Sequence, residues 1–109
     1  TAARQGVAAC SNETRGVLGG GATSGSRVNI IEYITIATTG NSTDFGDLTQ
    51  ARYNGGACAN ATRGVWGGGE SGGTFYNILD YVTIANTGNA TDFGDLTAAR
   101  NYNPAASGD

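Results

Sequence analysis

The sequence TGNSTDFGDLTQAR at residues 39–52 returns as TGNATDFGDLTAAR at residues 87–100. The shift from residue 39 to residue 87 is 48 positions, and it extends upstream, because 26 of 39 positions are identical between residues 14–52 and 62–100. Periods of about 40 to 50 residues with strand-forming content are typical of propeller blades. The chain therefore contains two copies of one unit.

The composition favours an all-β protein. The 109 residues include 19 glycines and one proline, and no histidine or methionine. Glycine without a collagen-like period, mixed with strand-forming residues, predicts many tight turns between strands. A net charge of −3, with only six cationic residues, argues against nucleic-acid binding. No apolar run reaches the roughly 18 residues of a membrane span, so we expect no membrane insertion.

Each repeat contains four predicted strands. In the first repeat these are residues 4–12, 17–21, 28–37 and 43–48. The third has the sequence VNIIEYITIA, which is apolar at most positions on both faces and predicts cover on both sides. Residues 22–26 are expected to form a loop before it.

Four antiparallel strands per repeat predict a β-propeller blade. The first blade is expected to span residues 1–52 and the second residues 53–100. Residues 101–109 repeat the start of a blade, so they form either an extra first strand or a tail.

The motif order resembles the kelch repeat. Arg4 is followed by glycine and small residues, then by hydrophobic residues that end in Gly-Gly at residues 17–20. A pair of an acidic residue and tyrosine, Glu32-Tyr33, follows, and Phe45 precedes the next arginine. Kelch repeats usually have tryptophan at the position of Phe45, and this chain also lacks their usual histidine. The resemblance implies a propeller; another propeller type or a β-solenoid is the alternative.

A second resemblance concerns the amino-acid sequence of the repeat itself. The pattern TRGV-x-GGG followed by ITIATTGN-x-TDFGDLT is similar to tandem repeats in tail-fibre-like proteins of marine and cyanobacterial phages. This resemblance favours a virion or another extracellular location.

Two blades cannot close a propeller, because rings have about four to eight. An uncovered apolar blade face is unfavourable at about 25 cal/mol per Å², so we expect the chain to assemble with copies of itself. A trimer with about six blades is the preferred expectation and a tetramer the next. Residues 101–109 could then pair with a neighbouring protomer, or the chain could be part of a longer array.

Several residues that could carry chemistry have structural interpretations instead. Cys10 and Cys58 occupy equivalent positions and are expected to remain buried thiols, because equivalent positions of adjacent blades stay apart. Asp44 and Asp92 are expected to accept backbone hydrogen bonds in a turn rather than bind calcium, since the EF-hand ligand spacing is absent.

The acidic residues of the third strands need partners. A buried carboxylate without a partner is costly, so Glu32 and Asp80 are expected to pair with arginine. Two sets of repeated arginines could supply the pairing: Arg15 and Arg63, or Arg4, Arg52 and Arg100.

Four asparagines begin Asn-x-Ser/Thr sequences at predicted turns: Asn12, Asn41, Asn60 and Asn89. Turn chemistry explains them without a glycan. The chain has no histidine, lysine, nucleophile elbow or phosphate loop, so we expect neither an enzyme nor a cofactor or metal.

The differences between the two copies are concentrated in two loops. The loop between the second and third strands reads ATSGSRV in the first copy and ESGGTFY in the second. The segment before each first strand also changes, and blade topology places both loops on one face. A constant scaffold with one varied face is typical of a recognition surface, although neutral drift of loops is the alternative.

The sequence therefore predicts a non-enzymatic propeller that oligomerises and recognises a surface ligand such as a glycan. The alternative is a purely structural repeat that builds a ring or filament and binds no ligand. The candidate ligand-binding residues are Arg27, Tyr53, Asn54, Glu70, Phe75, Tyr76 and Tyr102.

Overall fold

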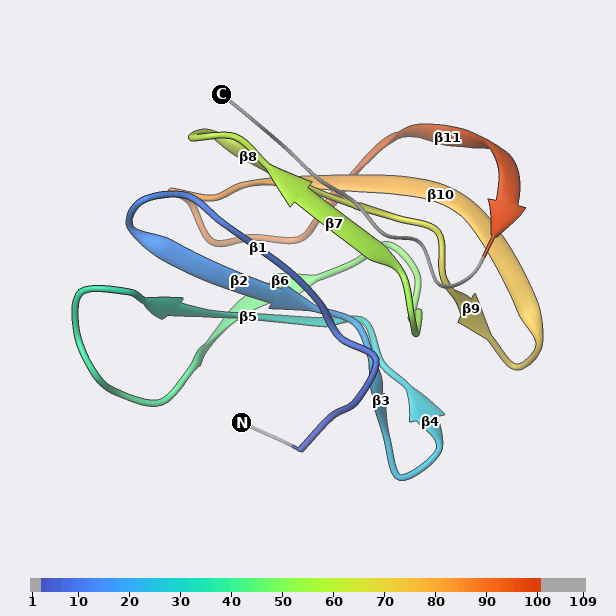
Figure 1. The fold of residues 1–109 in the computed structure, drawn as a ribbon, viewed down its shortest axis with the longest axis horizontal. Helices are drawn as coiled ribbons and strands as arrows, with labels where there is room; N and C mark the ends of the chain where they lie inside the picture. The colour runs from blue at the N-terminus through green and yellow to red at the C-terminus, as the bar shows by residue number, and fades with distance from the viewer. Residues whose placement is uncertain (1–2, 101–109) are drawn as a thin grey trace.

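The computed structural model describes residues 3–100, and every regular element in that range is a β-strand. The all-β prediction is confirmed. The strands form two main sheets with antiparallel pairing, which lie one over the other in Figure 1, and a separate two-stranded hairpin. Among the described residues, no helix exists that could cross a membrane.

The first repeat forms a four-stranded sheet in which chain order and spatial order agree. Its strands are β1 (Ala8–Ser11), β2 (Arg15–Gly19), β5 (Ile30–Thr35) and β6 (Thr43–Asp47). The second repeat forms the equivalent sheet from β7 (Gly56–Ala59), β8 (Arg63–Gly67), β10 (Thr74–Thr83) and β11 (Thr91–Arg100). Each repeat therefore contains the four predicted strands in the predicted order, together with further short strands that were not predicted.

Two features differ from the prediction. The first strand was expected from residue 4, but β1 begins at Ala8, because Gln5 pairs with Ala22 and Gly6 has a φ of 67°, which an extended strand does not adopt. The expected loop at residues 22–26 contains a small hairpin of β3 (Ala22–Thr23) and β4 (Ser26–Arg27). Ser24 and Gly25 have φ values of 43° and 88° at its tip, the left-handed conformation that two-residue hairpin turns require. In the second repeat, β9 (Glu70–Ser71) pairs with the start of β10 in the same way.

The core lies between the two sheets. Its buried members include Val17, Ile31, Phe45, Trp66, Val82 and Ile84. Because side chains alternate across a strand, each sheet also has an outer side. The outer side of the first sheet includes Leu18, Ile34 and Ile36, and that of the second sheet includes Arg63, Leu79, Tyr81 and Phe93.

The third strand of the first repeat is covered on one side and only partly covered on the other within the described chain. Ile31 is fully buried, whereas Ile34 and Ile36 on the outer side are exposed. The expectation of cover on both sides is therefore not met by the two repeats alone.

The turns between first and second strands depend on asparagine, as predicted. The Asn12 side-chain oxygen accepts hydrogen bonds from the backbone N–H groups of Thr14 and Arg15, at 2.9 and 2.8 Å. Asn60 makes the same two contacts in the second repeat. Asn12 also donates to the carbonyl of Ala61, so this turn joins the two repeats.

Candidate functional site

The varied segments of both repeats lie at one edge of the molecule. Backbone bridges join Gln5 to Ala22 in the first repeat and Tyr53 to Glu70 in the second. The segment before each first strand therefore meets the base of the hairpin that follows the second strand. In Figure 1 both hairpins lie at the right, while the turns between β1 and β2 and between β5 and β6 lie at the left. This is the arrangement expected for the proposed recognition face.

Three of the predicted site residues form one cluster. The Arg27 Nε atom donates to Glu70 Oε1 at 2.8 Å, and its Nη2 atom binds the same carboxylate. The Arg27 guanidinium also lies over the Tyr53 ring, 4.6 Å from the centroid. The cluster spans the two repeats, because Arg27 belongs to the first hairpin and Glu70 to the second. Arg27 and Glu70 therefore bind each other and also position Tyr53.

Asn54 has a backbone reason for its identity. Its φ is 62°, and the equivalent residue of the first repeat, Gly6, has φ 67°. Asparagine and glycine are the residues that tolerate this left-handed conformation best. The backbone N–H of Asn54 donates to the Gly6 carbonyl at 3.0 Å. Its buried side-chain nitrogen has no hydrogen-bond partner among the described residues.

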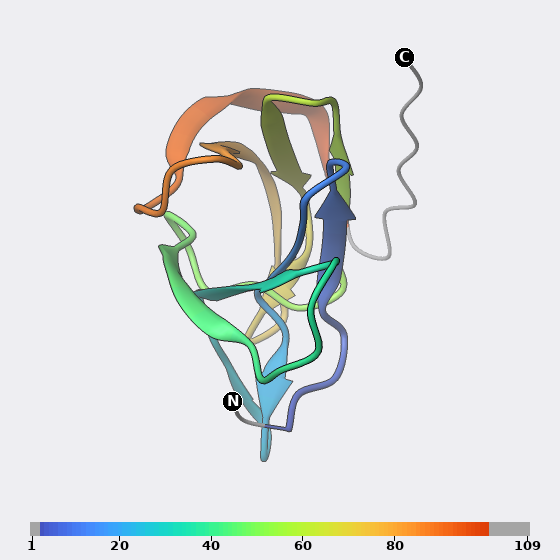
Figure 2. The same ribbon diagram turned by 90° about the vertical axis from the view of Figure 1, so that its left-hand side faces the viewer.

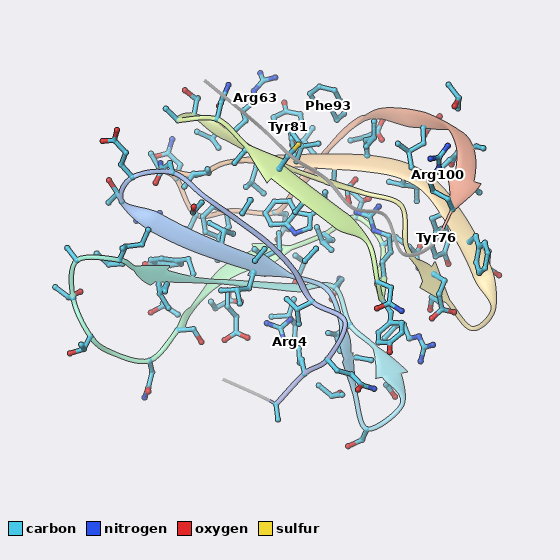
Figure 3. The ribbon with its side chains drawn as sticks, in the orientation of Figure 1. Arg4, Arg63, Tyr76, Tyr81, Phe93 and Arg100 are labelled. Atoms are coloured by element: carbon cyan, nitrogen blue, oxygen red, sulfur yellow. The ribbon has the colours of Figure 1, made fainter. Side chains whose placement is uncertain are left out.

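The remaining predicted residues have different surroundings. Phe75 is 53% exposed and pairs through its backbone with Glu70, so it extends the cluster toward solvent. Tyr76 is half-buried and lies opposite Arg100 in the β10–β11 pairing, where Figure 3 shows the two side chains near each other. Tyr102 lies outside the described residues.

The Arg27–Glu70 contact predicts a pH-dependent contribution to stability. The hydrogen bond from Arg27 lowers the pKa of Glu70 below the ordinary value of 4.5, partial desolvation opposes this, and a backbone hydrogen bond from Gly73 adds to the lowering. A lowered pKa stabilises the folded state above 4.5, and this contribution is lost as the pH falls through the folded-state pKa. We expect Glu70→Gln to be less stable than the native chain at pH 7.

Urea unfolding of both proteins from pH 7 to pH 3 measures this effect. The difference between native and Glu70→Gln should shrink only below pH 4.5. Arg27→Ala, measured in parallel, should make the Glu70→Gln substitution almost neutral at every pH. A difference that stays constant down to pH 3 would exclude the ion pair as its cause.

The buried acidic residues are paired with arginine, as predicted. Arg4 binds Glu32 and also donates to the carbonyls of Gly20 and Ile30. Arg52 repeats this arrangement, with its Nη2 atom 2.9 Å from Asp80 Oδ2 and its Nη1 atom 2.7 Å from the Ile78 carbonyl. Of the two sets of arginines that the sequence left open, this is the set that contacts the carboxylates.

The arginines of the other set, Arg15 and Arg63, contact aromatic rings instead. The Arg15 guanidinium lies 4.3 Å from the centroid of Tyr33, and Arg63 lies 4.5 Å from that of Tyr81. Arg15 also donates to the Ile84 carbonyl in the second repeat, at 2.9 Å.

The remaining candidates for chemistry have structural surroundings. Cys10 and Cys58 are free thiols, as predicted, but both are half-buried rather than buried. Partial burial, with a smaller contribution from Cys58, raises the pKa of Cys10 to about 12. The prediction of a turn at Asp44 and Asp92 is wrong, because both residues lie within strands, opposite Glu32 and Asp80. The bulges in β6 and β11 allow this pairing, and the sequence pattern did not show them.

A polar cleft missed by the sequence reasoning lies beside the loop between β5 and β6. Its volume is about 240 Å³, and its lining includes Tyr33, Ile34, Thr39, Gly40 and Asn41. The loop sequence TTGNST is almost unchanged in the second repeat. Candidate sites were predicted from differences between the repeats, so the sequence did not point to this loop.

Comparison with known proteins adds no family assignment. No protein-family model matches the chain, and no curated protein matches it either. The similarity to kelch repeats and to phage fibre repeats therefore stays a prediction from the motifs.

Proposed function

We propose that this chain is a non-enzymatic propeller module of kelch-like type, which assembles with copies of itself and recognises a glycan on a surface. The observation that carries the recognition part is the position of the varied residues. The varied residues of the two hairpins lie at one edge; they are Arg27, Tyr53, Glu70 and Phe75. The ion pairs that support the strands, Arg4–Glu32 and Arg52–Asp80, are instead equivalent in both repeats. A duplicated scaffold that carries varied side chains is how binding loops are usually held.

The chemistry of this edge suits a sugar ligand. Exposed aromatic rings can stack on the apolar face of a sugar, and Phe75 is the most exposed aromatic ring of this edge in the described chain. The Arg27 guanidinium lies close to it, is partly exposed and has N–H groups beyond those that Glu70 accepts, so it can donate to sugar hydroxyls. Binding on an extracellular or virion surface is consistent with this chemistry.

Assembly is supported by the two uncovered outer sides. Each sheet stacks one side on the other sheet and leaves exposed apolar side chains on its outer side, Ile34 and Ile36 on the first sheet and Phe93 on the second. Six blades from three copies are the preferred ring and eight blades from four copies the next, since propellers have about four to eight blades.

A second candidate function is purely structural assembly without a ligand. One observation favours it: Arg27 and Glu70 already bind each other, so their charged groups are not free to bind a ligand without breaking this pair.

A glycan array with native protein and two substitutions of Phe75 distinguishes the two candidates. Recognition predicts binding that Phe75→Ala weakens about tenfold or more, the loss expected when a buried aromatic contact worth at least about 1.4 kcal/mol is removed. Phe75→Tyr keeps the ring and should keep the binding. No signal from native protein on the array, or equal binding by Phe75→Ala, contradicts recognition at this edge.

A further inference from the structure

The two main sheets stack like successive blades, both turned the same way. The inner side of the second sheet is therefore equivalent, by the 48-residue repeat, to the outer side of the first sheet, and the inner side of the first to the outer side of the second. Val17, Ile31 and Phe45 of the first sheet face Trp66, Val82 and Ile84 of the second. A shift by one repeat carries Phe45 onto Phe93 and carries Ile36 onto Ile84. Each buried surface of this interface therefore has a counterpart on an outer side.

The counterparts are exposed where the originals are buried. Phe45 is 3% exposed and Phe93 is 52% exposed. Ile84 is fully buried, whereas Ile36 is 53% exposed, and Ile34 is exposed beside it. Exposed apolar groups gathered on one side of a sheet indicate an interaction surface. The same chain carries both halves of one interface.

Hydrogen bonds at the sheet edge show the same relation. The loop between β10 and β11 binds the free edge of β6: the N–H of Gly88 donates to the Phe45 carbonyl at 2.8 Å, and the N–H of Asp47 donates to Asn89 Oδ1 at 3.0 Å. Figure 2 shows this orange loop next to the green strand β6. The equivalent edge is that of β11, and the equivalent loop contains Gly40 and Asn41.

Glycine permits this close approach at the edge. A Cβ atom on Gly46 would lie 2.1 Å from the Gly88 carbonyl oxygen, whereas a Cβ atom on Gly94 would meet no atom of residues 3–100 within 4 Å. The φ values of Gly46 and Gly94 are nearly equal, at 155° and 152°. Gly94 therefore has the same backbone shape in β11 without the loop that occupies it in β6.

The arginines that stack on tyrosine extend the comparison. Arg15 lies over Tyr33 and donates across the interface to the Ile84 carbonyl. Arg63 lies over Tyr81, next to Phe93, and Figure 3 shows these three side chains together on the second sheet. The acceptor that corresponds to the Ile84 carbonyl is the carbonyl of Ile36, on the outer side of the first sheet.

We infer that the outer side of the second sheet binds the outer side of the first sheet in another copy of this chain, head to tail. This inference rests on the oligomerisation in the proposed function and names its surfaces. The expected contacts are Gly40 N–H to the Phe93 carbonyl, Asp95 N–H to Asn41 Oδ1, and Arg63 to the Ile36 carbonyl. Phe93 and Ile36 lose their exposure in this contact.

The contact between copies lacks two features of the contact within the chain. Trp66 donates to the Ala8 carbonyl at 3.1 Å, and its counterpart Leu18 cannot donate. In the contact between copies, Phe75 of one copy takes the place of Arg27, and Ala22 of the next copy takes the place of Glu70, so no ion pair forms there. The interface between copies is therefore weaker than the one within the chain, and a head-to-tail interface closes into a ring when the rotation permits.

Native mass spectrometry of two single variants and their mixture tests this inference. Phe93→Asp removes one half of the interface and Ile36→Asp the other, and both side chains are exposed in the single chain. We expect native protein to form a closed oligomer, preferably a trimer, at micromolar concentration, and each variant alone to be monomeric. A mixture of the two variants should give a dimer and nothing larger, because each variant keeps one intact half.

The matched controls are Phe93→Leu and Ile36→Val, which keep an apolar side chain at each position and should leave the native mass unchanged. Circular dichroism verifies that each variant is folded. A monomeric native protein overturns both this inference and the proposed oligomerisation. Native oligomers that persist in Phe93→Asp or Ile36→Asp overturn only the head-to-tail surfaces, as does a mixture of variants that stays monomeric. The masses do not depend on glycan binding, so the recognition proposal is tested separately.

Discussion

Asp80→Ala is expected to destabilise the chain by about 3–5 kcal/mol, the usual result of removing one partner from a buried ion pair. Asp80 is fully buried, and Arg52 is nearly so. Besides Arg52, the Asp80 carboxylate accepts hydrogen bonds from the Thr49 hydroxyl at 2.7 Å and from the Thr49 N–H at 3.0 Å. The substitution leaves a buried guanidinium cation whose charge is uncompensated and a hydroxyl without its acceptor.

Urea unfolding followed by circular dichroism measures this loss. Removing both charges in Arg52→Met/Asp80→Leu should cost less than removing Asp80 alone, because no unpaired charge stays buried. A single substitution that costs less than about 1 kcal/mol, the range of exposed ion pairs, would show that the Arg52–Asp80 pair is not shielded from water.

Trp66→Ala should also cost about 3–5 kcal/mol, because a large buried side chain is replaced by a cavity. Trp66 is 2% exposed in the core between the sheets, and its Nε1–H donates to the Ala8 carbonyl. Its counterpart in the first repeat, Leu18, lies half-buried on an outer side. We expect Leu18→Ala to cost much less, although the two residues occupy the same position of the repeat.

The measurement is best made in the Phe93→Asp background, so that contacts between copies do not contribute to the cost at Leu18. Circular dichroism is the suitable probe, since Trp66 is the single tryptophan of the sequence. Equal costs for Trp66→Ala and Leu18→Ala would contradict the assignment of inner and outer sides.

The repeat predicted the sheets well because strand formation is local. Alternation of apolar residues within residues 28–37 and glycine at the strand ends define strands without any knowledge of neighbours. The pairing of Glu32 with Arg4 was predictable in kind, since a buried carboxylate needs a cation. The choice between Arg4 and Arg15 was not, because it depends on which side of β5 each arginine reaches.

Contacts between repeats were the part that sequence reasoning missed. The ion pair of Arg27 with Glu70 joins two loops that were compared only as variants of each other. Their opposite charges were a usable signal, but only stacking of the sheets brings them together. The binding of the loop at Gly88 to the edge of β6 likewise depends on the stacking, and neither repeat alone contains it.

Arg52 has a mechanical consequence that follows from its two attachments. Its carbonyl accepts from the Gly21 N–H of the first repeat at 2.7 Å, while its side chain is inserted beside Asp80 in the second. The connection between the repeats therefore has no slack that could lengthen under tension. A force that pulls on the two ends of the chain acts on this junction and on both sheets together, so the repeats resist as one element rather than yielding in turn.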